Sequence, residues 1–409
     1  MSEVADGKGA TLVVPSGIDS NGASATEVCF EAKPQRLKPI LYGDLSARVN
    51  SGPSRARLSG FAPFVQPRTL APDDSSGSLF PSMSNFSIGV DLGGTNLRIA
   101  AVDEQGNLLE KIALDTRVTL GLDRVIRDMC GAIEQLSVKY RSGGVLHGIG
   151  IGVPGIIDMK TGMLRESANM PGWGNSPVQA EIEQRLGTRV ILENDANVAA
   201  LGENWLGAAR DVNDMAILTL GTGVGGGIVL GRRIWHGMTG MAGEFGHTTV
   251  EPDGVPCGCG NRGCLEQYAS AKAVTRMAQE AGVDHASARA VYNLAVQGDQ
   301  GAKKVFSRVG RALGIVIASA VNALNLPMYV LAGGVTSAWD EFSPAMFEQV
   351  RLRSVVFAAT APEDPAGTGQ GASAQVAPGG STRTIITRTL LGSDAGLYGA
   401  ARLATMDVQ

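Results

Sequence analysis

A strand that ends in a glycine-rich turn and continues into a second strand occurs twice in this chain of 409 residues. The first copy joins a strand at 86–91 to a turn at 93–95, and the second joins a strand at 216–220 to a turn at 221–223. Glycine permits sharp turns and brings backbone N–H groups close to a ligand. Because helices follow each copy, we expect a duplicated α/β fold with two lobes and a cleft between them.

The spacing of hydrophobic residues predicts further strands and helices around the two glycine-rich turns. Alternating apolar residues predict strands, and apolar residues three and four positions apart predict helices. In the first copy we expect strands at 86–91, 97–102, 108–114, 146–153 and 189–193, helices at 122–140 and 176–186, and a helix from Asn197. In the second copy we expect strands at 216–220, 226–230, 234–235, 328–332 and 383–387, and a long helix at 302–324.

Proline content separates an N-terminal extension from the remainder of the chain. Residues 1–82 contain 8 of the 18 prolines and show no sustained helical or strand period, which predicts disorder. Met83, directly before the first strong strand, is a candidate start of the protein. The predicted parts are a disordered extension at 1–83, a small α/β lobe at 84–205, a large α/β lobe at 206–392 with a flexible insert at 358–382, and a C-terminal helix at 393–405 that packs on the small lobe.

Charge and hydropathy narrow the classes of partner. The net charge is −4, from 35 basic and 39 acidic residues that are well mixed. No basic stripe points to nucleic acid or an anionic membrane. No stretch approaches the roughly 20 uninterrupted apolar residues of a membrane-spanning helix, and the N-terminus lacks a secretory pattern. We therefore expect a cytoplasmic protein without a nucleic-acid or membrane partner.

The two glycine-rich turns are suited to binding phosphate groups. A single turn of this kind is also what an ordinary tight hairpin looks like. Two turns in repeated meanders, however, can hold a triphosphate from both sides of a cleft, and Asp91 is placed to hold Mg²⁺ through water. A further glycine pair after a buried strand would admit adenosine close to the backbone. The candidate ATP- and Mg²⁺-binding residues are Asp91, Gly93, Gly94, Thr95, Asn96, Gly221, Thr222, Gly223, Gly333 and Gly334.

Two other nucleotide-binding patterns fit the chain poorly. The sequence contains no GxxxxGK[ST] motif, which excludes a Walker-type loop. It also lacks a strand-GxGxxG-helix arrangement with a later acidic residue, which disfavours a dinucleotide-binding domain.

Four candidate metal ligands lie within 18 residues of one another. They are His247, Cys257, Cys259 and Cys264. In a reducing compartment, one imidazole and three thiolates at this spacing favour tetrahedral Zn²⁺ over disulfides. The alternative is a group of free buried cysteines. Because the protein fills all four positions, the zinc would be structural, and it would fix the loop that carries Glu244 and Glu266.

Several separate motifs together resemble the ROK family (repressors, open reading frames and sugar kinases). They are DLGGT at 91–95, GVPG at 152–155, ENDAN at 193–197, GTG at 221–223, GEFGH at 243–247, and CGCG with GCLE at 257–266. The resemblance runs from about Phe86 to the C-terminus. It implies a two-lobed actin-like ATPase (ribonuclease H-like) fold, bound ATP and Mg²⁺, and a homodimer.

The resemblance also implies which residues bind and phosphorylate a sugar. The residues implied to contact the sugar are Gly155, Asn169, Asn194, Asp195, Glu244, His247 and Glu266. Asp195 would be the catalytic base, which takes the proton from the attacking hydroxyl as the new bond to phosphorus forms.

Several of these residues also have a plainer interpretation. Asn194 and Asp195 both suit a helix N-cap, and capping and catalysis can coexist. Glu244 and Glu266, taken singly, are typical of solvated surface acids, although their position beside the metal ligands weakens that interpretation. The remaining histidines are interpreted as structural: His147, His236 and His285.

The expected activity is therefore ATP-dependent phosphorylation of a hexose, with glucose as the first choice. Kinases for N-acetylglucosamine, N-acetylmannosamine, fructose or allose remain alternatives, as does a phosphoryl donor other than ATP. A sugar-responsive transcriptional regulator is a further alternative, but the family's repressors carry an N-terminal winged helix and this chain shows none. A chaperone-like or cytoskeletal ATPase would not explain the group formed by Glu244, His247 and Glu266.

Overall fold

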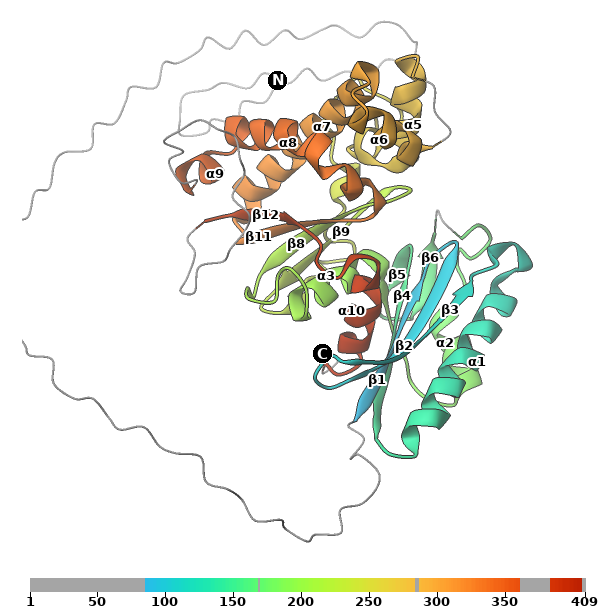
Figure 1. The fold of residues 1–409 in the computed structure, drawn as a ribbon. Helices are drawn as coiled ribbons and strands as arrows, with labels where there is room; N and C mark the ends of the chain where they lie inside the picture. The colour runs from blue at the N-terminus through green and yellow to red at the C-terminus, as the bar shows by residue number, and fades with distance from the viewer. Residues whose placement is uncertain (1–84, 168–169, 284–286, 361–382, 407–409) are drawn as a thin grey trace, which may run out of the picture. The chain divides into compact units, whose positions relative to one another are not determined.

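The computed structural model describes residues 85–167, 170–283, 287–360 and 383–406 (Figure 1). The predictions for the extension at 1–83, for Asn169 and for His285 fall outside these residues, as does most of the predicted insert at 358–382. Two five-stranded sheets organise the described residues, and a two-stranded sheet accompanies them.

The first sheet has the strand order β3-β2-β1-β4-β7. Its strands are β1 (Phe86–Leu92), β2 (Asn96–Asp103), β3 (Leu108–Asp115), β4 (Leu146–Val153) and β7 (Ile191–Asn194). Strands β1, β2 and β3 form an antiparallel meander, whereas β4 and β7 run parallel to β1. The parallel strands bring their carboxyl ends to one edge of the sheet, which is where ligands bind in open α/β folds.

The second sheet repeats this arrangement with the strand order β10-β9-β8-β11-β12. Its strands are β8 (Met215–Leu220), β9 (Val224–Leu230), β10 (Arg233–Ile234), β11 (Met328–Ala332) and β12 (Ile385–Arg388). Again the first three strands form an antiparallel meander and the last two run parallel to the first. The predicted duplication of a β-meander within a mixed α/β fold is therefore confirmed.

Helices cover both faces of the first sheet. The helix α1 (Leu122–Arg141) packs on one face, where its buried residues join a hydrophobic core with β1, β2 and β4, and α2 (Val178–Leu186) packs against α1. The helix α10 (Ala395–Leu403) lies on the other face, against β1, β2 and β4 (Figure 1, red). Its approach requires glycine on the sheet, since a Cβ atom at Gly150 would lie 2.0 Å from the carbonyl oxygen of Ala400.

The second sheet has α3 (Asp195–Trp205) on one face and a layer of helices on the other. That layer comprises α4 (Glu266–Ala269), α5 (Ala271–Glu280), α6 (Ala288–Val296), α7 (Gln300–Leu324), α8 (Trp339–Arg353) and α9 (Val355–Thr360). The helix α7 is long and apolar enough to cross a membrane by length and composition, but 67% of its most apolar window is buried within the protein. Its apolar character is therefore explained by its place in the core.

The predicted elements differ from the observed ones at their ends, in the short elements, and in the helices α5 and α6, which were not predicted. The helix expected from Asn197 begins two residues earlier, at Asp195. The hairpin β5 (Ile156–Asp158) and β6 (Met163–Glu166) was not predicted, because strands of three and four residues are too short to show a period. The helix α8 was also not predicted, and it contains Pro344, a residue that normally ends a helix.

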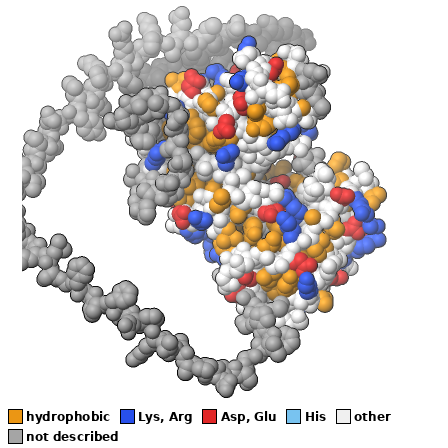
Figure 2. Space-filling model, in the orientation of Figure 1, with side chains coloured by type: hydrophobic (Ala, Val, Ile, Leu, Met, Phe, Trp, Pro, Cys, Tyr) orange, Lys and Arg blue, Asp and Glu red, His pale blue; other side chains and the backbone are white. Residues whose placement is uncertain are grey.

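Charged side chains of both signs are interspersed on the face of the molecule shown in Figure 2. No area of that face, within the described residues, gathers basic side chains alone. This distribution agrees with the balanced sequence composition of 35 basic and 39 acidic residues.

Candidate active site

Asp195 is the first residue of α3 and directly follows β7. The side chain of Asn194 caps this helix, since its Oδ1 accepts hydrogen bonds from the backbone N–H groups of Ala196 at 2.9 Å and Asn197 at 3.2 Å. The capping position therefore belongs to Asn194. The Asp195 carboxylate accepts a hydrogen bond from the N–H of Ala196 at 2.9 Å, and it is held at the strand end without being needed for the cap.

The surroundings of Asp195 raise its affinity for a proton. Burial is the main cause, and it raises the pKa of the Asp195 carboxyl to about 7. The negative charges of Asp91 and Glu244 raise this pKa further, while the N–H of Ala196 opposes them. Carboxylates from β1, from α3 and from the segment before Phe245 thus act on one another. A carboxyl group whose pKa lies near neutrality is suited to general base catalysis.

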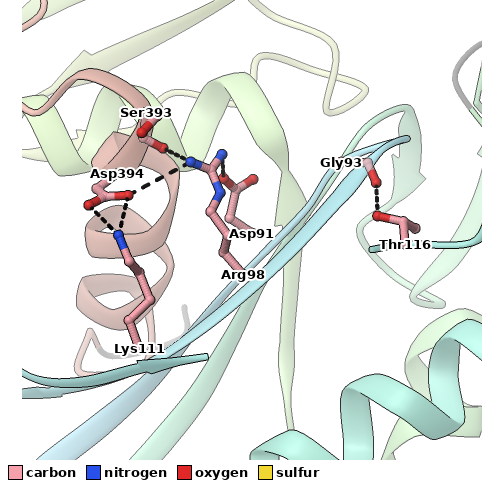
Figure 3. A network of polar contacts seen from close by, with 7 residues as sticks. All are labelled: Asp91, Gly93, Arg98, Lys111, Thr116, Ser393 and Asp394. Atoms are coloured by element: carbon pink, nitrogen blue, oxygen red, sulfur yellow. Dashed lines mark hydrogen bonds and ion pairs between the residues drawn. The ribbon is translucent and has the colours of Figure 1, made fainter. Parts of the chain in front are cut away.

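Asp91, near the end of β1, belongs to a network of charged groups shown in Figure 3. Its Oδ2 lies 2.5 Å from Nη2 of Arg98 on β2. The same guanidinium donates to the carbonyl oxygen of Ser393 at 2.5 Å, and Asp394 pairs with Lys111 at 2.9 Å. Burial raises the pKa of Asp91 above its usual value, although Arg98 opposes the rise. The network links the end of β1 to the start of α10.

The first turn, residues 93–95, is a tight connection between β1 and β2. The N–H of Gly93 donates to the carbonyl oxygen of Asn96 at 2.8 Å, and the hydroxyl of Thr116 donates to the carbonyl oxygen of Gly93 at 2.6 Å. Thr95 and Asn96 are exposed at the tip. The predicted residues of this turn therefore lie together beside Asp91, with polar groups at the surface that can meet a phosphate.

The second turn, residues 221–223, borders a cavity of about 440 Å³. The residues around this cavity are Gly221, Thr222, Ala271, Val274, Ala288, Arg289, Tyr292, Phe306, Gly334, Val335, Ser337 and Ala338. Gly333 directly precedes the lining residue Gly334 and has a backbone angle φ of +92°. A Cβ atom at Gly333 would lie 2.4 Å from the carbonyl oxygen of Leu220. Of the predicted residues, Gly221, Thr222 and Gly334 thus meet at one cavity, whose apolar and aromatic walls suit a nucleoside.

Three of the predicted sugar ligands line a separate, small cavity. They are Gly155, Asn194 and Glu244. The Nδ2 of Asn194 donates to the carbonyl oxygen of Gly155 at 3.1 Å, and Gly155 has φ +130°, which favours glycine. The same cavity is lined by Glu193 and Asn197, which the sequence reasoning did not single out.

Glu266 occupies a different position from Glu244. Its Oε2 accepts a hydrogen bond from the N–H of Val224 at 3.0 Å, directly after the second turn. It lines a cavity of about 220 Å³ together with Thr222, Gly223 and Lys272. The structure therefore places Glu266 at the second turn, and the cavity around Asn194 and Glu244 is lined by other residues.

The four predicted metal ligands come together in the structure. The ligand atoms of His247, Cys257, Cys259 and Cys264 all lie within 4.8 Å of one another. The distance from Cys259 Sγ to Cys264 Sγ is 3.7 Å, and that from Cys257 Sγ to His247 Nδ1 is also 3.7 Å. Ligands at tetrahedral corners around Zn²⁺, with Zn–S bonds of about 2.3 Å, are separated by about 3.5 to 3.8 Å. The donor set and its spacing fit zinc.

His247 faces two groups at once. Its Nδ1 belongs to the cysteine cluster, whereas its Nε2 lies 3.9 Å from Oε2 of Glu244. The predicted roles of His247 as a metal ligand and as a sugar ligand therefore involve different ring nitrogens.

Sequence reasoning missed three residues near this site. Arg98 was detectable in principle, because the hairpin register sets it opposite Asp91. Glu193 belongs to the ENDAN motif, but its carboxylate was not assigned a role. His236 is predicted to be structural, and its Nε2 lies 2.6 Å from Oε2 of Glu193, a contact that the sequence does not predict. No sequence signal relates His236 to Glu193, because they are 43 positions apart.

Known proteins are similar to this chain in sequence and in fold. A glucokinase of Halalkalibacterium halodurans is 39% identical over 269 residues, which are 62% of this chain and 81% of that protein. A ROK hexokinase structure from Thermus thermophilus has a TM-score of 0.64 and 34% identity, and the match covers 77% of this chain and 96% of that chain. A ROK family glucokinase from Streptomyces griseus, in complex with glucose and AMPPNP, has a TM-score of 0.61 and 31% identity over 78% of this chain and 99% of that chain.

The duplicated sheets and their glycine-rich turns define an actin-like ATPase fold, which is also the fold of the ROK kinase structures. The profile of the ROK family matches residues 87–406. The chain belongs to the ROK family.

Proposed function

We propose that this protein is an ATP-dependent glucokinase, which transfers the γ-phosphoryl group of ATP to the 6-hydroxyl of glucose. The similarity to the glucokinase of H. halodurans and to the glucose- and AMPPNP-bound structure from S. griseus supports this activity. The observation that carries the proposal is the placement of Asp195. Its carboxylate lies at a strand end, interacts with Asp91 and Glu244, and has a pKa of about 7.

Asp195 is the general base of the proposed reaction. It accepts the proton of the sugar hydroxyl while the oxygen attacks the γ-phosphorus and ADP leaves, so the sugar gains the phosphoryl group. A positioned base of this kind contributes roughly 10² to 10⁴-fold to a rate. Asn194, Glu244 and Gly155 orient the sugar beside it, and we propose the same role for His247 Nε2, for Glu266 and for Asn169.

The two turns bind the nucleotide in this proposal. Backbone N–H groups of Gly94, Thr95, Thr222 and Gly223 would face the phosphates, and the cavity of about 440 Å³ would receive the adenosine beside Gly334. The oxygen donors of Asp91 fit Mg²⁺, which would neutralise charge on the phosphates. Arg98, which holds the Asp91 carboxylate, would orient it toward that ion.

Zinc has a structural role in this proposal. His247 and the three cysteines would hold it, and the ion would stiffen the loop next to Glu244. Elemental analysis should find about one zinc per chain. Cys259→Ser should lower both the zinc content and the thermal stability, and full metal content with unchanged stability in that variant would contradict the site.

The proposal also covers the cellular location, the oligomeric state and the lobes of the enzyme. We propose a cytoplasmic homodimer that feeds glucose into glycolysis, with a small lobe at 84–205 and a large lobe at 206–392. Light scattering on the purified protein tests the dimer, since a monomer at all concentrations would remove that part of the proposal.

A panel of sugars in a coupled ADP-release assay tests the proposed activity. Glucose should give the highest kcat/KM among glucose, fructose, allose, N-acetylglucosamine and N-acetylmannosamine, because buried hydrogen-bonding groups reject a sugar that leaves them unpaired. A higher kcat/KM with an N-acetylhexosamine would show that the protein is a sugar kinase whose preferred substrate is not glucose. No turnover with any of these sugars would contradict the proposed function.

A further inference from the structure

A contact beside the candidate sugar cavity has no part in the chemistry above. His236 lies on the segment after β10, and its Nε2 is 2.6 Å from Oε2 of Glu193 at the end of β7. We propose that His236 is a positioning residue, which holds the segment carrying Glu244 against the end of β7 and thereby sets the affinity for the sugar. This inference rests on the proposed function, in which Glu244 is a sugar ligand.

Glu193 provides a rigid anchor for this contact. Its side chain is 2% exposed, and both carboxylate oxygens are engaged. Oε1 accepts hydrogen bonds from the N–H of Asn194 and from Nδ2 of Asn197, each at 2.9 Å, while Oε2 faces His236. A buried carboxylate with three fixed partners has little freedom to rotate. The position of His236 is therefore tied to the residues that flank Asp195.

The segment held by His236 forms a wall of the sugar cavity. Its lining residues are Gly240, Met241, Ala242 and Glu244. At its far end it contacts β9 closely, since a Cβ atom at Gly226 would lie 2.2 Å from the carbonyl oxygen of Gly243. Between the two anchors the segment is largely exposed, and Met238 is 97% accessible. At its near end the backbone N–H of Trp235 donates to the carbonyl oxygen of Ile228 on β9, and the contact of His236 with Glu193 is the side-chain contact that joins this end to β7.

The chemistry of the pair favours a strong contact. The hydrogen bond to Glu193 raises the pKa of His236 above its usual value, and partial burial opposes the rise. Among the described residues, Glu193 is the charged group that shifts this imidazole. A hydrogen bond from the imidazole to the Glu193 carboxylate is charge-assisted, and such bonds are about twice as strong as neutral ones.

Loss of this contact should affect sugar binding before it affects the chemical step. Without the imidazole, the segment can move away from β7, and Glu244 leaves the position in which it meets the sugar. Asp195 keeps its own supports, because the Asn194 cap and the Oε1 contacts of Glu193 are unchanged. A role limited to folding would instead lower stability without distinguishing glucose from ATP.

The test compares His236→Ala with His236→Gln in the full chain. Calorimetric titration with glucose should show an increase in Kd of about 10-fold for His236→Ala, since a charge-assisted hydrogen bond is lost. The kcat should stay within about twofold and the KM for ATP should not change. His236→Gln should recover most of the affinity, because its amide N–H can still donate to Glu193.

His147→Ala is the matched control. His147 also faces a glutamate, with Nε2 3.2 Å from Glu104 Oε1, and its side chain is 33% exposed compared with 35% for His236. It lies away from the sugar cavity, so its loss should leave the glucose Kd unchanged. If His236→Ala does not fold, His236→Asn replaces it, since the shorter amide does not reach Glu193 and should weaken glucose binding where His236→Gln does not.

Unchanged glucose affinity in a folded His236→Ala protein would overturn the inference, as would equal weakening of glucose and ATP binding. Failure of the proposed function gives a different result, namely no hexose binding by the unaltered protein in the same titration. The two failures are therefore distinguishable.

Discussion

The two sheets of this protein share a strand order and differ in what their strand ends carry. In the first sheet, the register of the hairpin β1-β2 pairs Asp91 with Arg98. In the second sheet, the corresponding pair on β8 and β9 is Thr219 and Gly225. Asp91 and Thr219 occupy corresponding positions, because each is the second-last residue of the strand that enters the turn. The last residue of that strand is Leu92 in one copy and Leu220 in the other.

The outermost parallel strands differ in the same way. Strand β7 leads into Asn194 and the half-buried Asp195, whereas β12 ends at Arg388, whose guanidinium lies 5.5 Å from the ring centre of Trp339. The first sheet thus places carboxylates at its edge, and the second sheet offers backbone groups and the cavity of about 440 Å³. In the proposed function, one duplicated backbone would therefore support two tasks: the first copy would supply the base and the Mg²⁺ ligand, and the second copy would receive the adenosine, while both turns would contact the phosphates.

The largest expected effect comes from removing the base of the first sheet. Asp195→Asn should lower kcat by about 10³-fold, because the amide cannot accept the hydroxyl proton. Glucose Kd should change by less than about threefold, since the amide oxygen keeps its size and can still accept a hydrogen bond. Stopped-flow or coupled assays with calorimetry measure both quantities. A kcat close to that of the unaltered protein would show that the first sheet does not supply the base.

Asp91→Asn tests the other carboxylate of the first sheet. A loss of about 10²-fold in kcat is expected, because charge on the transferring phosphoryl group is then less well stabilised. The Mg²⁺ concentration needed for half-maximal ATP binding should also rise, which a titration monitored by intrinsic fluorescence can follow. Thr219→Ala, at the corresponding position of the second sheet, should have a much smaller effect on both quantities.

The pH dependence of kcat/KM for glucose should show the raised pKa of Asp195, which is about 7. The base must be ionised, so the rate should fall about tenfold per pH unit below that value. Because the charge of Asp91 raises the pKa of Asp195, Asp91→Asn should move the acid limb to lower pH. An acid limb that stays in place would contradict the proximity of the two carboxylates.

The same shift has a consequence for stability, with the sign set by the raised pKa. Burial makes the ionised form of Asp195 unfavourable in the folded protein, so the protonated carboxyl stabilises the fold relative to the ionised one. This stabilisation is complete below pH 3.8, the ordinary pKa of the group, and is lost as the pH rises through about 7. Asp195→Asn should therefore raise the Tm more at about pH 8 than at about pH 5. A thermal shift measurement at the two pH values, with the unaltered protein alongside, checks the direction.

The smallest expected effect lies in the second sheet. Gly333→Ala forces a side chain into φ +92° and against the carbonyl oxygen of Leu220, which should disturb the wall of the nucleotide cavity. The KM for ATP should rise about 10-fold while the glucose Kd stays unchanged. The control is Gly131→Ala in α1, where an added Cβ would meet no atom within 4 Å beyond its chain neighbours and the backbone of its own helix. Equal weakening of glucose and ATP binding would contradict the division of tasks.

Much of the fold was predictable because it depends on patterns among residues that are close together in the sequence. Short apolar strands flank a glycine-containing turn in both meanders, at 93–95 and at 221–223, so the duplication can be recognised in the order of the residues alone. The four metal ligands were predictable for the same reason, since they lie within 18 residues. Short elements such as β5, and the proline-containing α8, do not show a clear period and were missed.

The parts of the site that depend on packing between distant segments were not predictable. Which cavity Glu266 lines depends on how α4 meets the second turn, and there its carboxylate accepts from the N–H of Val224. The pairing of His236 with Glu193 joins residues 43 positions apart. The pKa of Asp195 likewise depends on burial by the whole fold, and no local pattern around an aspartate reports it.

A crystal structure with glucose and a non-hydrolysable ATP analogue tests the central claim most directly. A carboxylate oxygen of Asp195 should lie about 2.6 to 3.2 Å from the 6-hydroxyl of the sugar, with the terminal phosphate on the opposite side of that hydroxyl. A complex in which Asp195 contacts no sugar oxygen, and another acidic side chain meets the 6-hydroxyl, would contradict the assignment of the base to the first sheet.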